Sequence, residues 1–194
     1  LPGEVYEIGA DSIELKLPGK HNVENAIASM AVAYQLGAQS EEIVKAVSSF
    51  EGVNRRFDRH VEGTYAYVDD YAHHPEEVKA TLNAVRLLYP EDKITVVFQP
   101  HLFSRTRDFA DDFAASLALA DELVLLEIYP AREKPIEGVH ANMLLNKIEL
   151  DLKSVMTQEE FLEELKNNKR EVLVTLGAGD IDQLVDPIKA IYKQ

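Results

Sequence analysis

Histidine, arginine and aspartate side chains gather in four loops, and each loop follows a run of apolar residues with the composition of a buried strand. The loops are residues 70–75, 99–105, 129–133 and 177–180. In an open parallel α/β sheet the carboxyl ends of the strands meet at one rim, and ligands bind there. The four loops therefore predict a binding site of polar side chains at one rim of a sheet.

The arginines are clustered although the chain as a whole is acidic. It has 34 Asp and Glu against 20 Lys and Arg, which gives a formal net charge of −14. That charge repels nucleic-acid backbones and anionic membranes, so neither is an expected partner. Clustered arginines indicate a site for a small anion, and ion pairing with the abundant carboxylates is the alternative. The clusters are Arg55, Arg56 and Arg59 beside His60, Arg105 and Arg107 near His101, and Arg132 alone in a Pro-rich loop.

Each of the other polar residues in these loops allows two interpretations. The His73-His74 pair suits a metal, but no carboxylate stands at the spacing of an H-E-x-x-H motif, so capping or packing is favoured. Asp70 can accept backbone N–H groups in a turn, or it can hold a ribose diol. Arg105 can clamp an anion or pair with Asp108 or Asp111.

Phosphate-binding and hydrolase motifs are weak or missing in the sequence. Residues 177–179 read Gly-Ala-Gly, but one such triplet is a weak phosphate signal, and turn geometry is the favoured reason for it. Gly19-Lys20 is not a P-loop, because it has no glycine at the required upstream spacing and His21 follows it. No other Walker A sequence and no Ser-His-Asp or Cys-His arrangement is found.

Two segments with different patterns must position these residues. Residues 1–53 predict a small α+β segment, in which Val23, Ile27, Met30 and Tyr34 mark the buried face of a helix that ends at Gly37. Its expected elements are strands 5–8 and 13–17, which turn at 9–11, a helix over 22–36, and a second helix that starts after its expected N-cap Ser40 and ends near Phe50.

Residues 54–194 alternate strands with helices, and this order predicts an α/β fold with a mostly parallel sheet covered by helices on both faces. Phe109, Phe113 and Leu117 mark the buried stripe of one helix. The expected strands are 57–62, 65–69, 94–98, 122–128, 154–156 and 172–176. The expected helices are 75–89, 105–119, 141–147, 157–166 and 181–192.

Composition bounds the class of protein. The chain has 194 residues, of which 46% are hydrophobic, so it is long enough and apolar enough to bury a core. It has no cysteine, which fits a reducing compartment, and no apolar run near the roughly 20 residues of a membrane span. No signal peptide opens it, and it begins with Leu1 rather than Met, so we expect it to be part of a longer protein.

Five motifs in the same chain resemble those of the Mur ligase family. Residues 19–26, G-K-H-N-V-E-N-A, resemble the family's G-x-H-N-x-x-N-A segment, and Arg55-Arg56-Phe57 resembles its interdomain R-F segment. Residues 69–75, D-D-Y-A-H-H-P, are similar to the D-D-Y-x-H-H-P loop of the alanine-adding branch. Residues 99–107 and 129–136 look like the same branch.

The resemblance implies a three-domain enzyme of which this chain is the C-terminal portion. Residues 1–53 would end the central ATP-binding domain, and residues 54–194 would be the Rossmann-like C-terminal domain. In the family, ATP phosphorylates a carboxylate of the substrate, and the amine of an amino acid attacks the acyl phosphate. The expected partners are ATP, L-alanine and UDP-N-acetylmuramate, in the cytoplasmic synthesis of peptidoglycan precursors.

Site residues also follow from the resemblance. Asn22 and Asn25 would contact adenine, Asp70 the ribose and Arg56 the phosphates of ATP. No catalytic side chain and no metal ligand is assigned, because the P-loop, the Mg²⁺ ligands and the UDP site would lie outside this chain. We therefore expect the chain alone to be inactive.

The amino-acid pocket would contain His73, His101, Arg105 and Arg132. Many alanine-adding enzymes have a basic residue where this chain has Leu102, which leaves open whether one or two arginines hold the alanine carboxylate. The alternatives are the murein tripeptide-recycling ligase of the same family and a standalone nucleotide-binding or regulatory module. The loops at 99–101 and 129–132 argue against the recycling ligase.

Overall fold

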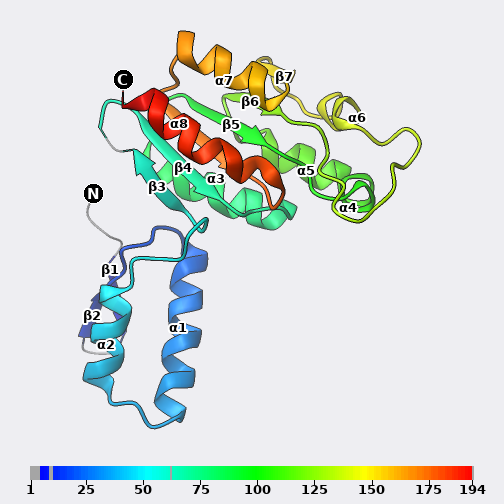
Figure 1. Cartoon of the computed structure of the whole chain (residues 1–194). Coiled ribbons are helices and arrows are strands. Elements are labelled where there is room, and N and C mark those ends of the chain that lie inside the picture. The colour runs from blue at the N-terminus through cyan, green and yellow to red at the C-terminus, as the bar shows by residue number, and fades with distance from the viewer. Residues whose placement is uncertain (1–4, 9–10, 62, 194) are drawn as a thin grey trace. The chain divides into compact units, whose positions relative to one another are not determined.

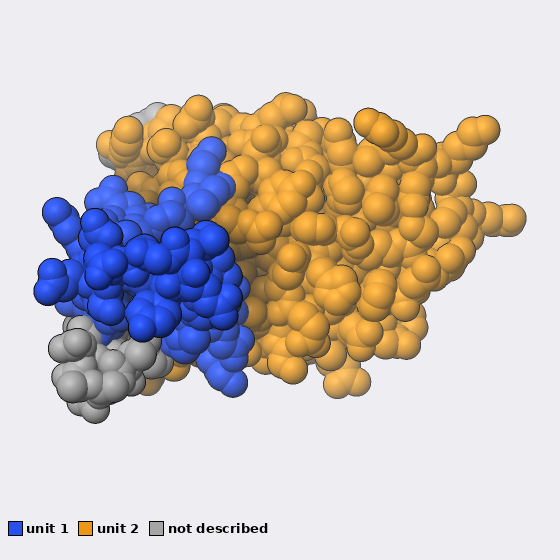
Figure 2. Space-filling view, turned by 90° about the horizontal axis from the view of Figure 1, so that it is seen from below, with its two compact units in different colours: residues 1–54 blue, residues 55–194 orange. Residues whose placement is uncertain are grey.

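A computed structural model describes residues 5–8, 11–61 and 63–193. Two compact units make up the chain, Leu1–Asn54 and Arg55–Gln194 (Figure 2). The boundary lies one residue beyond the one expected after residue 53. No helix in the described part of the chain is long and apolar enough to cross a membrane.

The first unit contains a two-stranded antiparallel sheet and two helices. Strand β1 (Val5–Ile8) pairs with β2 (Asp11–Glu14), and α1 (Lys20–Gln35) and α2 (Ser40–Ser49) follow. The second strand therefore begins and ends earlier than the expected 13–17, and residues 9 and 10 of the expected turn lie outside the described residues. Gly37 ends the first helix with a left-handed φ of 92°, as predicted.

The prediction for the buried face of α1 is wrong for Ile27 and Tyr34. Only Val23 of this helix is buried, where it packs with Ile13 and Leu15. Ile27 is 48% exposed and Tyr34 is 67% exposed. Met30 packs against the cluster that contains Val23, so only part of the apolar face of α1 is left exposed among the described residues.

The second unit is a six-stranded sheet in the order β3-β4-β8-β5-β6-β7 (Figure 1). The edge strand β3 pairs with β4 in antiparallel fashion, and every other pair is parallel, which confirms the mostly parallel sheet. The strands are β3 (Asp58–Val61), β4 (Ala66–Asp70), β5 (Ile94–Phe98), β6 (Glu122–Leu125), β7 (Lys153–Val155) and β8 (Val172–Leu176).

Helices cover both faces of this sheet, because its central strands are buried on both sides and need an apolar layer on each. One layer contains α3 (Pro75–Leu88), α5 (Ala110–Leu117) and α6 (Ala141–Leu145). The other contains α7 (Gln158–Asn167), the 3₁₀ helix η1 (Asp180–Leu184) and α8 (Val185–Tyr192) (Figure 1). The Rossmann-like α/β class is therefore confirmed.

Two expected elements of this unit are shorter in the structure. The helix expected over 105–119 is divided into α4 (Phe103–Asp108) and α5, because Phe109 leaves helical geometry with φ −114° and ψ 22°. Phe113 and Leu117 are fully buried as expected, but Phe109 is 36% exposed, and its ring lies 4.9 Å from that of His74. Phe109 therefore packs against His74 instead of joining the buried stripe of the helix. The strand expected over 122–128 ends at Leu125.

Glu122 lies in a partly buried ion-pair network at the amino ends of the parallel strands. Its carboxylate is 2.7 Å from Lys93 Nζ and 2.8 Å from Arg170 Nη2, and Arg170 also pairs with Glu164. Burial opposes the charge on Glu122, but its hydrogen bond to Lys93 and the charge of Arg170 outweigh burial and hold its pKa below the usual value. The pKa of Glu122 is therefore lower in the folded protein than in the unfolded chain. The ion pairs of Glu122 stabilise the fold fully above its unfolded pKa of about 4.3, and this stabilisation is lost as the pH falls through the folded pKa.

We predict that Glu122→Gln makes the domain less sensitive to acid. The variant should lose about 1–2 kcal/mol of unfolding free energy at pH 7. It should then lose less than the wild type between about pH 5 and pH 3, since it has no carboxylate to protonate. Urea unfolding at several pH values measures both effects, with exposed Glu91→Gln as the matched control. Equal acid sensitivity of the wild type and Glu122→Gln would contradict the prediction.

Candidate functional site

The four polar loops lie side by side at the carboxyl ends of β4, β8, β5 and β6, which are consecutive neighbours in the sheet. Backbone hydrogen bonds join each loop to the next. Gly177 N donates to Asp70 O at 3.2 Å, Gln99 N to Leu176 O at 3.0 Å, and Leu102 N to Tyr129 O at 3.0 Å. The predicted rim site is therefore confirmed as a place where these loops meet.

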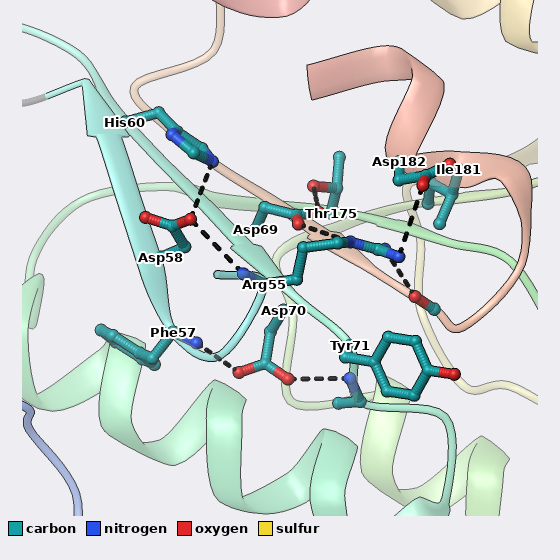
Figure 3. A network of polar contacts seen from close by, with 12 residues as sticks. Arg55, Phe57, Asp58, His60, Asp69, Asp70, Tyr71, Thr175, Ile181 and Asp182 are labelled. Carbon is teal, nitrogen blue, oxygen red and sulfur yellow. Dashed lines mark hydrogen bonds and ion pairs between the residues drawn. The ribbon is translucent and has the colours of Figure 1, made fainter. Parts of the chain in front are cut away.

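The most buried charge of the rim belongs to Asp69, a residue to which the sequence analysis assigned no role (Figure 3). Its side chain is fully buried at the end of β4, and it accepts hydrogen bonds from Arg55 Nε at 3.0 Å and Thr175 Oγ1 at 2.6 Å. The Tyr67 hydroxyl lies 3.0 Å from Thr175 Oγ1, and burial raises the pKa of this tyrosine far above its usual range. Arg55 Nη2 donates to Gly177 O at 2.7 Å, so one guanidinium ties two loops together.

Asp70 holds two turns of the rim through its carboxylate (Figure 3). Phe57 N donates to Oδ2 and Ala72 N to Oδ1, each at 2.7 Å, and the side chain is almost fully buried. Burial raises the pKa of Asp70, while the two N–H donors and Arg56 act against that rise. The turn-holding role is therefore present in the structure, and the ribose contact stays a prediction.

Backbone strain is concentrated at this rim. Among the described residues, four non-glycine residues have positive φ: Arg55 at 61°, Phe57 at 50°, Leu102 at 75° and Ala131 at 49°. Such conformations cost on the order of 1–3 kcal/mol each and persist only where surrounding contacts enforce them. Leu102 shows this directly, since its N–H is bonded to Tyr129 O and its carbonyl accepts the Thr106 amide and hydroxyl.

Arg56 is exposed and lies against Tyr71. The centre of its guanidinium is 5.3 Å from the Tyr71 ring centroid, and that of Arg55 is 5.4 Å from the same ring. Cation–π contacts of this kind are worth about 0.5–1 kcal/mol at exposed sites. Arg56 is therefore an exposed cation whose contact with Tyr71 is weak.

A row of rings continues from Tyr71 across the rim. Tyr71 and His73 meet edge to face at 5.2 Å, His73 and His101 at 5.9 Å, and His101 stacks on Tyr129 at 5.7 Å. Burial lowers the pKa of His101, and the neighbouring Arg105 and His73 act in the same direction, so its imidazole is neutral near pH 7. The structure thus brings together the predicted residues His73 and His101.

His74 turns outward from this row and caps α3. Its Nδ1 accepts a hydrogen bond from Glu76 N at 3.4 Å, while the Glu77 carboxylate accepts from the amides of His73 at 3.0 Å and His74 at 3.1 Å. The capping interpretation of this histidine is confirmed. No group of three or more potential metal ligands occurs in the described ranges.

Arg105 approaches His101 from α4, and the ion pairs proposed as its alternative role are made by other residues. Asp108 pairs with Arg107 at 2.7 Å, and Asp111 pairs with Lys147 at 2.7 Å. Arg105 Nη1 is buried without a hydrogen-bond partner, and so is His101 Nδ1. Buried donors of a charged group without partners are costly, and a bound anion satisfies them.

The remaining predicted residues are less constrained. Arg132 is exposed in the loop after β6. Asn22 and Asn25 belong to the first unit, three residues apart on one face of α1. Asn22 Nδ2 donates to Pro18 O at 2.7 Å, which holds the turn before the helix, and Asn25 is exposed.

Gln99 packs the loop after β5 against the Gly-Ala-Gly loop, and the sequence analysis quoted it in a motif without assigning it a role. Its Nε2 donates to Asp180 Oδ1 at 2.6 Å, and its Oε1 accepts from Ile181 N at 3.0 Å. A Cβ on Gly179 would lie 2.4 Å from Gln99 Oε1 and 2.6 Å from Tyr129 Cγ. Close loop packing therefore explains Gly179, and Gly177 has a positive φ of 151°, a conformation that favours glycine.

A comparison with protein families and a comparison with known sequences point to the same group of proteins. Residues 55–180 match the family model described as Mur ligase, glutamate ligase domain. The chain is 50% identical over 185 residues to the UDP-N-acetylmuramate–L-alanine ligase of Cytophaga hutchinsonii, covering 95% of this chain and 40% of the relative. It is 51% identical over 178 residues to the Flavobacterium psychrophilum enzyme of the same name, covering 91% and 40%. The chain thus spans about 40% of the length of these curated relatives.

Solved structures show the same fold. A UDP-N-acetylmuramate–alanine ligase from Thermotoga maritima aligns with a TM-score of 0.72 at 30% identity, over 94% of this chain and 40% of that one. A murein peptide ligase from Psychrobacter arcticus aligns with a TM-score of 0.67 at 19% identity, over 96% and 43%. The second likeness concerns the fold alone.

We predict that Gly179→Ala destabilises the second unit by about 1–3 kcal/mol, because the new methyl group overlaps Gln99 and Tyr129 in a packed loop. Chemical denaturation measures the loss. Ala178→Ser, at the partly exposed neighbouring position, is the control and should stay within about 0.5 kcal/mol of the wild type. A Gly179→Ala variant as stable as this control would show that the two loops are not packed as described.

Proposed function

The chain belongs to the Mur ligase family, and on that premise we propose that it is the C-terminal portion of an ATP-dependent ligase that adds L-alanine to UDP-N-acetylmuramate. The relatives of 50% and 51% identity carry that activity in their names. The product would serve peptidoglycan precursor synthesis in the cytoplasm, where ATP and nucleotide sugars are available.

One observation carries the proposal: the unpartnered, buried donor of Arg105 beside the neutral His101. L-Alanine offers only a methyl group, an amine and a carboxylate. Its amine must stay neutral and free to attack, so the carboxylate is the group by which a protein can hold it. A guanidinium can bind a carboxylate through two parallel hydrogen bonds, which fixes the direction of the amine as well.

The remaining predicted contacts are assigned to ATP. Arg56 is exposed and can donate to phosphate oxygens. Asp70, at the end of β4, is assigned to the ribose. Asn22 and Asn25 offer amide groups suited to the edge of adenine. Positive charge near the transferred phosphoryl group and the acyl phosphate lowers the barrier by stabilising developing negative charge. The described residues contain no cluster that fits Mg²⁺, so its ligands are assigned to the rest of the enzyme.

The exposed apolar face of α1 supports the assignment of residues 1–53 to a larger central domain. Ile27 and Tyr34, seven residues apart on one face of α1, are each about half exposed or more. Burial of such side chains is worth roughly 1.5–3 kcal/mol each, which favours a covering layer of protein. The length of the relatives is consistent with this, since the chain spans about 40% of them.

The murein peptide-recycling activity is the less favoured alternative. The structure of the murein peptide ligase from Psychrobacter arcticus is 19% identical to this chain, against about 50% for relatives named as alanine ligases. A standalone nucleotide-binding module would leave the apolar face of α1 and the free donor of Arg105 without a role.

We predict that Arg105→Lys in the full-length protein lowers kcat/KM for L-alanine by about 10- to 100-fold, because an ammonium keeps the charge but loses the planar pair of donors. Steady-state kinetics with varied alanine, at saturating ATP and UDP-N-acetylmuramate, measure the change. Arg107→Lys is the matched control, since Arg107 is exposed on the same helix and pairs with Asp108. If both variants keep wild-type efficiency, the alanine carboxylate binds elsewhere, and His73 or Arg132 becomes the better candidate.

We also predict that the chain alone shows no alanine-dependent phosphate release from ATP. It has no P-loop to hold the phosphates, and phosphoryl transfer depends on that cradle. The assay supplies ATP, L-alanine and UDP-N-acetylmuramate to the isolated chain and, in parallel, to the full-length protein. Turnover by the chain near 1 per second, a usual enzymatic rate, would overturn its assignment as one portion of the active site. Lack of turnover by the full-length protein would overturn the proposed reaction.

A further inference from the structure

We infer that Asp69 and Arg55 are positioning residues for Arg56, an inference that rests on the proposed role of Arg56 at the phosphates of ATP. The buried Asp69–Arg55 pair is shown in Figure 3. It would hold the turn at residues 55–57 in the one conformation that presents the Arg56 side chain at the rim. Neither positioning residue needs to touch a ligand for this purpose.

The turn that carries Arg56 has an unfavourable backbone. Arg55 and Phe57, the residues on both sides of it, have φ values of 61° and 50°, in the left-handed region that non-glycine residues avoid. A short segment of this kind relaxes to another conformation unless contacts from outside the segment hold it. The position of Arg56 therefore depends on what binds its two neighbours.

Backbone groups of the turn are bonded to the end of β4. Arg55 O accepts a hydrogen bond from Tyr71 N at 2.8 Å, and Phe57 N donates to the Asp70 carboxylate at 2.7 Å. The Phe57 side chain is buried in the apolar core, which fixes the far end of the turn. These contacts orient the backbone on both sides of Arg56.

The Arg55 side chain supplies the strongest anchor. It is only 15% exposed, and its Nε lies 3.0 Å from the fully buried Asp69 carboxylate. Its Nη2 donates to Gly177 O at 2.7 Å, so the anchor reaches a second strand end. Because an unpaired buried charge is strongly unfavourable, Asp69 and Arg55 hold one another in this geometry.

Arg56 itself lacks such an anchor in the described part of the chain. Its side chain is exposed and its guanidinium lies over Tyr71, a weak contact that leaves the donors free for an anion. Its placement is therefore set mainly by the backbone. Loss of the Asp69–Arg55 pair should therefore weaken the use of ATP, as loss of the Arg56 side chain would.

A double-mutant cycle on the full-length protein tests this inference. The variants are Asp69→Asn, Arg56→Ala and the combination, with Asp151→Asn as an exposed control. Asparagine keeps the size of Asp69 but places a neutral amide against Arg55. We expect Asp69→Asn to lower kcat/KM for ATP by about tenfold, and to add less than about twofold to the loss caused by Arg56→Ala, because both act through one group. KM for L-alanine should change by less than about twofold.

Additive losses in an active enzyme would overturn the inference, since a general structural defect does not depend on whether Arg56 is present. An unchanged kcat/KM for ATP in Asp69→Asn or in Arg56→Ala would also overturn it. If Asp69→Asn does not fold, Arg55→Lys takes its place in the same cycle, and the same non-additive result is expected. Absence of ATP-dependent turnover by the wild-type full-length protein would overturn the proposed function, and this inference with it.

Discussion

Two adjacent buried carboxylates at the end of β4 organise the rim of this domain. A charged side chain that leaves water must be paired or hydrogen-bonded, since its desolvation is otherwise too costly. Asp69 meets that requirement with Arg55 and Thr175, and Asp70 meets it with the amides of Phe57 and Ala72. The partners come from the segment before β3, from β8 and from the loop after β4. The pairing of two carboxylates therefore determines the arrangement of three separate parts of the chain.

The strand order explains why these parts belong to one site. Because β4, β8, β5 and β6 are neighbours and parallel, their carboxyl ends present four loops in a row, although the loops are up to about a hundred residues apart along the chain. Strained conformations occur at Leu102 and Ala131 in these loops and at Arg55 and Phe57 in the segment before β3, and hydrogen bonds to neighbouring segments hold Arg55, Phe57 and Leu102. A rim built in this way has little freedom to adjust, which suits a reaction that depends on fixed positions of charge and nucleophile.

Sequence patterns were sufficient for the fold and for the rim at which the four polar loops meet. Apolar runs separated by helical periodicity predicted the parallel sheet, and polar residues after each run predicted the rim. Patterns failed where tertiary contacts decide the outcome. Phe109 has the right spacing for the stripe of one helix, but its contact with His74 accompanies a break in the helix. Ile27 and Tyr34 have the spacing of a buried face, yet the described part of their unit offers nothing to cover them. Asp69 and Arg55 were passed over because only the folded chain shows that Asp69 pairs with Arg55, and that Arg55 rather than Arg56 is largely buried.

The central claim is that this rim holds the substrate amino acid through Arg105 while Arg56 faces ATP. The most direct measurement is a crystal structure of the full-length protein with ADP and L-alanine bound. The account predicts the alanine carboxylate within hydrogen-bond distance of Arg105 Nη1, close to His101, with Arg56 directed toward the phosphates. Alanine bound away from Arg105, with Nη1 of that residue bonded to another protein group, would contradict it.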